Sequence, residues 1–103
     1  MFNDIAGFDW DIGNQEKCCK HGVSLPEIES LFACAIAVLP DPAHSQTETR
    51  FKAIGRTPKG RGIFIVFTLR AKQGRTYIRP VSARYMHKNE IEDYEKAIPR
   101  TEQ

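Results

Sequence analysis

Two arginines late in the chain, Arg79 and Arg84, are the residues whose type and setting best suit the binding of an anion. They lie in the run 78–85, Ile-Arg-Pro-Val-Ser-Ala-Arg-Tyr, whose β-branched and aromatic residues are typical of a strand. A guanidinium group stays charged and donates parallel hydrogen bonds to a phosphate or a carboxylate. We expect this run to bind a phosphate or a partner's carboxylate. The alternative leaves one arginine in solvent and pairs the other with a glutamate of the final helix.

The spacing of these two arginines makes a geometric demand on the strand. They are an odd number of residues apart, so a regular strand would point them to opposite faces of its sheet. Pro80 cannot donate a ladder hydrogen bond, which indicates an edge position or a bulge. A bulge adds one residue and would turn both arginines to the same face. The sequence therefore predicts an irregularity near Pro80 or Ser82.

Positive charge is concentrated in the second half of the chain. Residues 1–49 hold two lysines and eight acidic residues, whereas residues 50–103 hold thirteen lysines and arginines and five acidic residues. Arg50 and Lys52 share one face of a predicted strand, and Arg70 ends the next one. We expect these cations to form a basic surface. In the alternative, each is a solvated charge and folding dilutes the basic half with the acidic half.

Histidine and tyrosine supply the remaining candidate groups. Among His21, His44 and His87, His21 is the strongest candidate, because Lys20 and His21 end a predicted helix just before Gly22. Tyr85, beside Arg84, is a candidate for stacking on a base. Each histidine has an ordinary structural or surface role as its alternative. No metal-ligand spacing is present, so we predict no metal and no cofactor, and we expect the three cysteines to be free thiols.

The helices and strands that position these residues are predicted from the spacing of apolar residues and from helix-capping residues. The residues 8–11 are expected to form a short extended entry. Ser24 and Glu27 form a capping box, and Gly22 is suited to a helix C-terminus. The predicted elements are helices at 11–21 and from 24, strands at 35–39, 50–55, 63–69 and 75–83, and a final helix at 88–98. Ile63–Leu69 is the most apolar strand and is expected to be central and covered on both faces.

These elements predict an α+β fold in a single domain, residues 1–103. Two N-terminal helices precede a four-stranded antiparallel sheet, because tight turns join consecutive strands, and one C-terminal helix follows. The chain has 41% hydrophobic and 27% charged residues, as folded soluble proteins do. Asp4, Asp9 and Asp11 lie where a signal peptide would have to be basic and apolar. We expect a cytoplasmic protein.

Taken together, these residues resemble the BrnT family of ribonuclease toxins of bacterial type II toxin–antitoxin systems. The resemblance covers about residues 8–95. It rests on two blocks in this order and spacing, Lys20-His21-Gly22-Val23-Ser24 and Ser82-Ala83-Arg84. The other matching residues are Phe8-Asp9-Trp10-Asp11, Asn14, Lys17, Asp41, His44-Ser45, Glu48, Arg50, Ile54-Gly55, Thr68, Ile78-Arg79-Pro80-Val81, Glu90 and Tyr94. One departure is Phe32-Ala33-Cys34, where many members carry acidic residues.

The resemblance implies a RelE-like fold and metal-independent cleavage of RNA as an endoribonuclease. It also implies an antitoxin of the BrnA type with a ribbon-helix-helix region, through which the complex would reach operator DNA. The antitoxin's carboxylates would occupy the arginines at rest.

Cleavage of RNA without a metal needs a base for the 2′-OH, stabilisation of the extra negative charge, and an acid for the leaving oxygen. We assign charge stabilisation to Arg79 and Arg84, with Arg50 or Arg70 assisting. We assign general acid or base catalysis to His21, with Lys20 as its electrostatic neighbour, and base stacking or proton donation to Tyr85.

Two other functions compete with this one. In the first, the chain is a non-catalytic basic module that only holds an acidic partner or nucleic acid. In the second, it is a sequence-specific DNA binder, which is disfavoured because no predicted helix has a basic face. The final helix carries Glu90, Glu92, Asp93 and Glu95.

Overall fold

A computed structural model describes residues 4–34, 37–44 and 47–97 of the chain. The elements in this part are β1 (Ile5–Phe8), α1 (Ile12–Cys19), α2 (Leu25–Ala33), β2 (Ala37–Pro40), a 3-10 turn η1 (Pro42–His44), β3 (Phe51–Arg56), β4 (Gly62–Lys72), β5 (Arg75–Tyr85) and α3 (Lys88–Ala97). They form an α+β fold, as predicted. Of the predicted ends, Ala35 and Ile98 lie outside the described residues.

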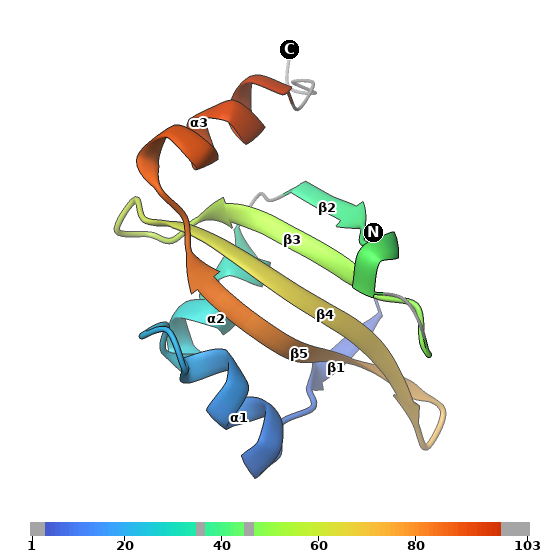
Figure 1. Ribbon diagram of the computed structural model, residues 1–103. Helices are drawn as coiled ribbons and strands as arrows, with labels where there is room; N and C mark the ends of the chain where they lie inside the picture. The colour runs from blue at the N-terminus through green and yellow to red at the C-terminus, as the bar shows by residue number, and fades with distance from the viewer. Residues whose placement is uncertain (1–3, 35–36, 45–46, 98–103) are drawn as a thin grey trace.

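The sheet has five strands in the order β1-β5-β4-β3-β2 (Figure 1). Strands β2 to β5 pair antiparallel, as predicted, whereas β1 pairs parallel with β5. The prediction of four antiparallel strands was therefore wrong about β1, which starts earlier than the extended entry expected at 8–11. β1 has four residues and pairs with a strand 70 positions later (Phe8 with Ile78), so neither its length nor a local turn marks it in the sequence.

The central strand, β4, has one apolar core on each face. Ile63, Ile65 and Phe67 belong to the main core, which also includes Ile28 and Leu31 of α2. On the other face, Phe64 packs beside Ile54, Met86, Ile91 and Tyr94 in a smaller cluster under α3. The Ile63–Leu69 run is therefore central, as predicted, and α3 covers its second face only at the end that carries Phe64.

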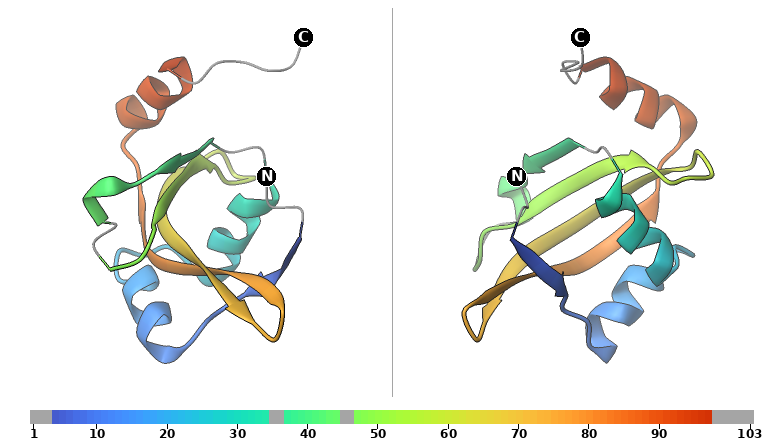
Figure 2. Two further views of the ribbon diagram at one scale, coloured as in Figure 1. Left: turned by 90° about the vertical axis from the view of Figure 1, so that its right-hand side faces the viewer. Right: turned by 180° about the vertical axis from the view of Figure 1, so that it is seen from behind.

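The helices take different positions around the sheet. α2 covers the face that is turned away in Figure 1, and the view from behind in Figure 2 shows it in front of the strands. α1 lies along β5, where the Asn14 side chain donates to the Pro80 carbonyl oxygen at 2.8 Å. α3 stands at one end of the opposite face and leaves the rest of it uncovered. We call this side of the sheet the open face.

Capping fixes where the first two helices begin. The Ser24 hydroxyl accepts from the Glu27 amide at 3.2 Å, and the Glu27 carboxylate accepts from the Ser24 amide at 3.0 Å, so the predicted capping box is confirmed. Asp11 and Asn14 form a second box at the start of α1. After α1 the chain reverses at Gly22, whose φ of 93° is a conformation that favours glycine.

No helix in the described residues is long and apolar enough to cross a membrane.

Candidate functional site

A bulge in β5 turns Arg79 and Arg84 to the same side of the sheet. Ser82 pairs with Val66 and Pro80 pairs with Phe67, so Val81 between them has no pairing partner on β4. As a result Arg84 lies opposite Phe64 and Arg79 lies opposite Thr68, two residues an even number apart on β4. Residues paired directly across a sheet point to the same face. The predicted irregularity between the arginines is therefore confirmed.

Arg79 is held by two aspartates from the N-terminal part of the chain. Its guanidinium lies 2.9 Å from the Asp11 carboxylate and 3.5 Å from that of Asp9. Asp9 also pairs with Lys72 at 2.8 Å. The Asn14 amide, and then Arg79, hold the pKa of Asp11 below its ordinary value. The Arg79 side chain is only 19% exposed, so its position is well constrained.

Arg84 is held by the final helix. Two of its nitrogens donate to the two carboxylate oxygens of Glu90, at 3.0 and 2.8 Å, and its guanidinium lies 4.8 Å from the Phe64 ring centroid. The hydrogen bonds with Glu90 raise the pKa of Arg84, and they lower the pKa of Glu90 in turn. This is the pairing that the alternative interpretation of the strand expected for one of the two arginines.

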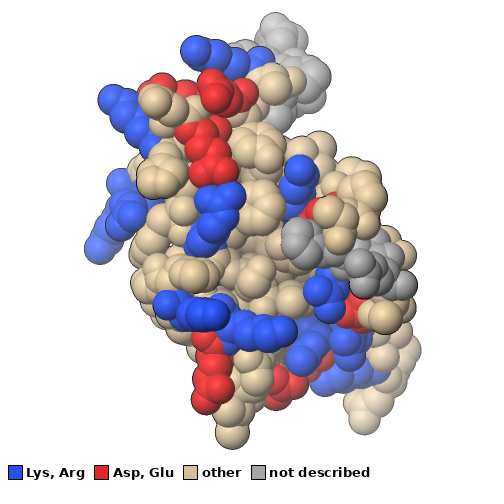
Figure 3. All heavy atoms as spheres, viewed as in Figure 1, with Lys and Arg blue, Asp and Glu red and all other residues tan. Residues whose placement is uncertain are grey.

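Arg50 and Arg70 share a carboxylate on the same face. Glu48 accepts from both, at 3.2 Å in each case. The predicted strand cations Arg50, Arg70, Arg79 and Arg84 are thus gathered on the open face, and we call them the sheet-face arginines. Figure 3 shows this face with basic side chains spread over it and acidic side chains beside them.

The other predicted residues lie elsewhere. Tyr85 pairs with Ile63 and so faces the α2 side of the sheet, opposite to Arg84. Its hydroxyl donates to Glu27 at 2.6 Å and lies 3.5 Å from the Gly22 carbonyl oxygen, beside the turn that carries His21. Lys20 and His21 are both exposed in this turn. The structure therefore brings Tyr85 close to the α1–α2 turn but separates it from the sheet-face arginines.

Arg61 is a member of this second region that sequence reasoning missed. Its guanidinium lies 3.6 Å from the Tyr85 ring centroid, in a stacked cation–π contact. In the sequence, Gly60-Arg61-Gly62 indicates only a turn between strands. No local signal marks the contact of Arg61 with Tyr85, because it depends on the pairing of β4 with β5, in which Tyr85 is the partner of Ile63. We call Lys20, His21, Glu27, Arg61 and Tyr85 the turn-side group.

The Tyr85–Glu27 hydrogen bond affects both partners. It is the largest cause of the raised pKa of Tyr85 and of the lowered pKa of Glu27. Both shifts favour a neutral phenol that donates to a charged carboxylate. The tyrosine ring is thus fixed in position, with Arg61 on one of its faces.

Cysteine and metal chemistry find little support in the described residues. All three cysteines are free, as expected, and burial raises the pKa of Cys18 to about 11, so its thiol stays protonated at neutral pH. In the described ranges, no group of three or more histidine, cysteine, aspartate or glutamate side chains is arranged to hold a metal. His44 ends η1.

Comparison with known proteins gives one family. A family described as "Ribonuclease toxin, BrnT, of type II toxin-antitoxin system" matches residues 10–90, a span that includes all the sheet-face arginines and the turn-side group. No curated protein matches the chain.

Proposed function

Because this chain belongs to the BrnT family of ribonuclease toxins of type II toxin–antitoxin systems, we propose that it cleaves RNA as a metal-independent endoribonuclease. The observation that carries the proposal is the bulge at Val81, which turns Arg79 and Arg84 to one face. Two guanidinium groups on one face can hold the same phosphate through charge-assisted hydrogen bonds.

The carboxylates that now hold these arginines are part of the argument. Glu90 occupies Arg84 with two oxygens, which is the geometry in which a guanidinium also binds two phosphate oxygens. The pair is partly exposed, so its net stabilisation is modest and an RNA phosphate can replace the carboxylate. Arg79 would keep its position through Asp11 while its remaining hydrogen-bond donors meet the phosphate.

The chemical step is an attack of the 2′-OH on the neighbouring phosphorus, in which the 2′-OH gives its proton to a base, the bond from phosphorus to the 5′-oxygen breaks, and the leaving 5′-oxygen takes a proton from an acid. The phosphorane that forms carries extra negative charge, and Arg79 and Arg84 stabilise it, with Arg50 or Arg70 assisting. We propose His21, with Lys20 beside it, as general acid or base, and Tyr85 as a residue that stacks on a base. Because the turn of His21 lies on the other side of the sheet from the arginines, this role requires RNA binding to bring the turn and the open face to the same phosphate. The contact between Tyr85 and the Gly22 carbonyl keeps this ring close to the histidine turn.

The family supports a proposal about the partner of the chain and its setting. We propose that a BrnA-type antitoxin with a ribbon-helix-helix region neutralises the chain in the cytoplasm and connects it to operator DNA. Its acidic side chains would compete with RNA for the sheet-face arginines. A RelE-like relationship of the fold remains part of this proposal.

The deciding experiment is RNA cleavage by the purified chain in excess EDTA. We expect cleavage to persist, and to fall roughly 100- to 1,000-fold in Arg79→Ala and Arg84→Ala, as when one transition-state donor is removed. Arg75→Ala is the matched control, because Arg75 is an exposed residue at the start of the same strand. Cleavage that is lost in EDTA, or kept in both variants, would contradict the proposal.

A second function is favoured by one specific observation. Glu48, Asp11 and Glu90 show that the sheet-face arginines readily hold carboxylates, as a surface for an acidic protein would. In that case the chain would bind its antitoxin without cleaving RNA. Induction of the chain alone separates the two functions, because only the enzyme would cause growth arrest with RNA decay that Arg84→Ala abolishes.

A further inference from the structure

A hollow of about 380 Å³ lies between the β3–β4 turn and the start of α3. The charged side chains that line it are those of Arg56, Lys59, Arg61, Lys88 and Glu92. Four of these residues are basic and one is acidic, and they come from three separate elements. An opening with such an excess of positive charge is suited to an anion.

The four cations of the hollow differ in how far they are already engaged. Arg56 is held by the two carboxylate oxygens of Glu95, at 2.6 and 2.9 Å, and Arg61 is stacked on Tyr85. Lys59 and Lys88 are exposed and have no ion pair with any of the described residues. Among the cations of the hollow, these two lysines are therefore the ones held by neither a carboxylate nor an aromatic ring.

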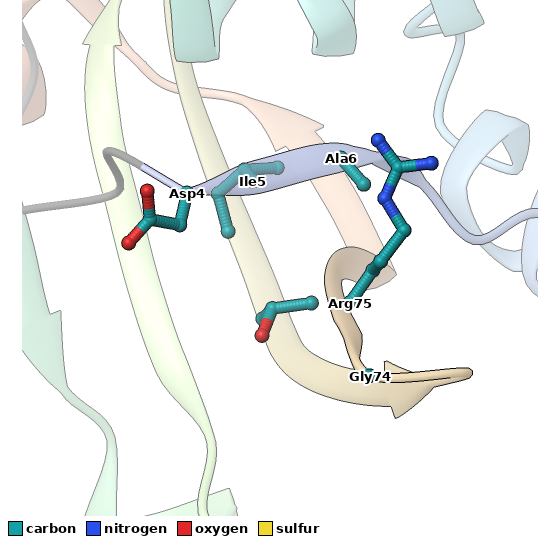
Figure 4. A pocket seen from close by; sticks show the side chains of 6 residues that line it. Asp4, Ile5, Ala6, Gly74 and Arg75 are labelled. Carbon is teal, nitrogen blue, oxygen red and sulfur yellow. The ribbon is translucent and has the colours of Figure 1, made fainter.

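A second hollow differs from the first in its balance of charge. It lies between β1 and the β4–β5 turn and is lined by Asp4, Ile5, Ala6, Gly74, Arg75 and Thr76 (Figure 4). Its one cation, Arg75, is balanced by its one carboxylate, Asp4. It has no excess of positive charge and contains none of the residues of the candidate site.

The first hollow also lies between the two halves of the candidate site. Gly62 is two residues from Phe64, the partner of Arg84, which corresponds to about 7 Å along β4. On its other side, Arg61 both lines the hollow and stacks on Tyr85. An RNA chain that passes from Arg84 to Tyr85 around the end of the sheet would cross this opening.

The shape of the hollow depends on a close contact at Gly62. A Cβ atom at this position would lie 2.9 Å from the Ile91 Cβ atom, which is closer than such atoms approach one another. Glycine thus lets α3 pack directly on the start of β4, with Ile91 only 2% exposed. This packing sets Lys88 across from the β3–β4 turn that carries Lys59.

We propose that this hollow is a phosphate subsite for single-stranded RNA, in which Lys59 and Lys88 bind a backbone phosphate that flanks the cleaved one. The inference rests on the proposed function and extends it beyond the arginines and the turn-side group. Lysine binds phosphate as a point charge, so the subsite contributes affinity without selecting a base.

The test measures binding of an RNA that cannot be cut. A fluorescent oligonucleotide with 2′-O-methyl riboses lacks the attacking hydroxyl, so its affinity is independent of catalysis. We expect the double variant Lys59→Gln, Lys88→Gln to bind it roughly tenfold more weakly at about 0.1 M salt. The slope of log affinity against log salt should also fall in magnitude by about 1.4, which corresponds to two lost contacts on single-stranded nucleic acid.

A matched control removes the same charge elsewhere. Lys17→Gln, Lys96→Gln changes two exposed lysines outside the hollow and should bind RNA within about twofold of the unmodified chain. Thermal unfolding of both double variants verifies that they are folded.

Three results would overturn the inference. If the Lys59 and Lys88 variant binds and cleaves RNA like the unmodified chain, the subsite is wrong while the ribonuclease function stands. If that variant loses only antitoxin binding, the hollow belongs to a protein partner. If the unmodified chain neither binds nor cleaves RNA, both the function and the subsite are wrong.

Discussion

Arg84 and Tyr85 are neighbours in β5, yet they belong to two regions that hold their cationic side chains in place by different contacts. On the open face, each sheet-face arginine is held by a carboxylate: Asp11 for Arg79, Glu90 for Arg84 and Glu48 for the other two. In the turn-side group, Arg61 rests on an aromatic ring, and Lys20 is exposed in the turn.

The difference shows that position and availability are separate properties of a binding cation. The carboxylates fix the sheet-face arginines in place, but RNA must displace Glu90 before it can use the two donors of Arg84 that this carboxylate occupies. Stacking fixes Arg61 and leaves its hydrogen-bond donors accessible to an anion. The open face thus gives a constrained and occupied site, and the turn side gives an open one.

The largest expected effect separates chemistry from binding. If His21 transfers a proton, His21→Ala should lower the cleavage rate roughly 100- to 10,000-fold. Binding of the 2′-O-methyl RNA should change less than threefold, since one imidazole is a small part of a phosphate-binding surface made of several arginines and lysines. Single-turnover cleavage and fluorescence anisotropy measure the two quantities. If cleavage and binding fell together, His21 would act in binding. The turn-side group would then be a binding region with no role in proton transfer.

A smaller effect is expected from the carboxylate of Glu90, which occupies Arg84 on the open face. Glu90→Gln removes the charge that holds Arg84, so we expect the affinity for 2′-O-methyl RNA to rise roughly threefold to tenfold. Asp93→Asn is the control, because it removes the same charge from the same helix at an exposed position. Equal gains from the two variants would show that the effect is general charge, with no release of Arg84.

A smaller effect is expected from the turn-side hydrogen bond. Tyr85→Phe removes the hydroxyl that donates to Glu27 and should lower the free energy of unfolding by about 1 kcal/mol at neutral pH. The ring and its contact with Arg61 remain, so cleavage should fall less than in Tyr85→Ala. Urea unfolding and cleavage rates measure the two effects. If Tyr85→Phe were as stable as the unmodified chain, the hydrogen bond to Glu27 would make no net contribution to the free energy of unfolding.

The same variant tests the pH dependence of the turn-side group. The pKa of Tyr85 is raised above 10.0, its ordinary value, so its contribution to stability is complete below pH 10.0 and is lost as the pH rises through the raised pKa. We expect Tyr85→Phe to remove this alkaline part of the stability curve. The measurement is unfolding by urea at a series of alkaline pH values, and an unchanged alkaline slope would count against it.

The smallest effect is expected at the aspartate that holds Arg79. The pKa of Asp11 is lowered from 3.8, so its contribution to stability is present above pH 3.8 and is lost as the pH falls through the lowered pKa. Asp11→Asn keeps an N-capping side chain but not the charge. This variant should therefore be slightly less stable at neutral pH and should lose less of its stability in acid. Thermal unfolding across the acid range measures this difference. If the variant lost stability with falling pH as steeply as the unmodified chain, the prediction would be contradicted.

Local signals in the sequence were enough to predict much of this arrangement. The capping box of Ser24 and Glu27 is a contact between near neighbours, and Pro80 marks a place where the ladder must be irregular. The apolar run in β4 indicated a strand covered on both faces. Each of these features depends on residues within a few positions of one another.

The missed features depend on distant parts of the chain. β1 pairs with β5 across about 70 residues, and this pairing brings Asp9 and Asp11 to Arg79. Arg61 reaches Tyr85 because two strands pair in one register. A single sequence contains no local signal for these contacts. The roles in RNA cleavage assigned to Arg79, Arg84 and His21 remain predictions.

The bulge at Val81 has a consequence for comparing relatives of this chain. Because side chains alternate along a strand, the extra residue sets which arginine faces which way. A homologue that lost one residue between the two arginines would lose the bulge as well, and its regular strand would still place both arginines opposite the same two residues of β4, four positions apart. A homologue that kept the five-residue spacing but paired without a bulge would direct one arginine to the opposite face. In an alignment, a gap at Val81 is therefore compatible with the same site, and the spacing of the two arginines must be judged together with the bulge.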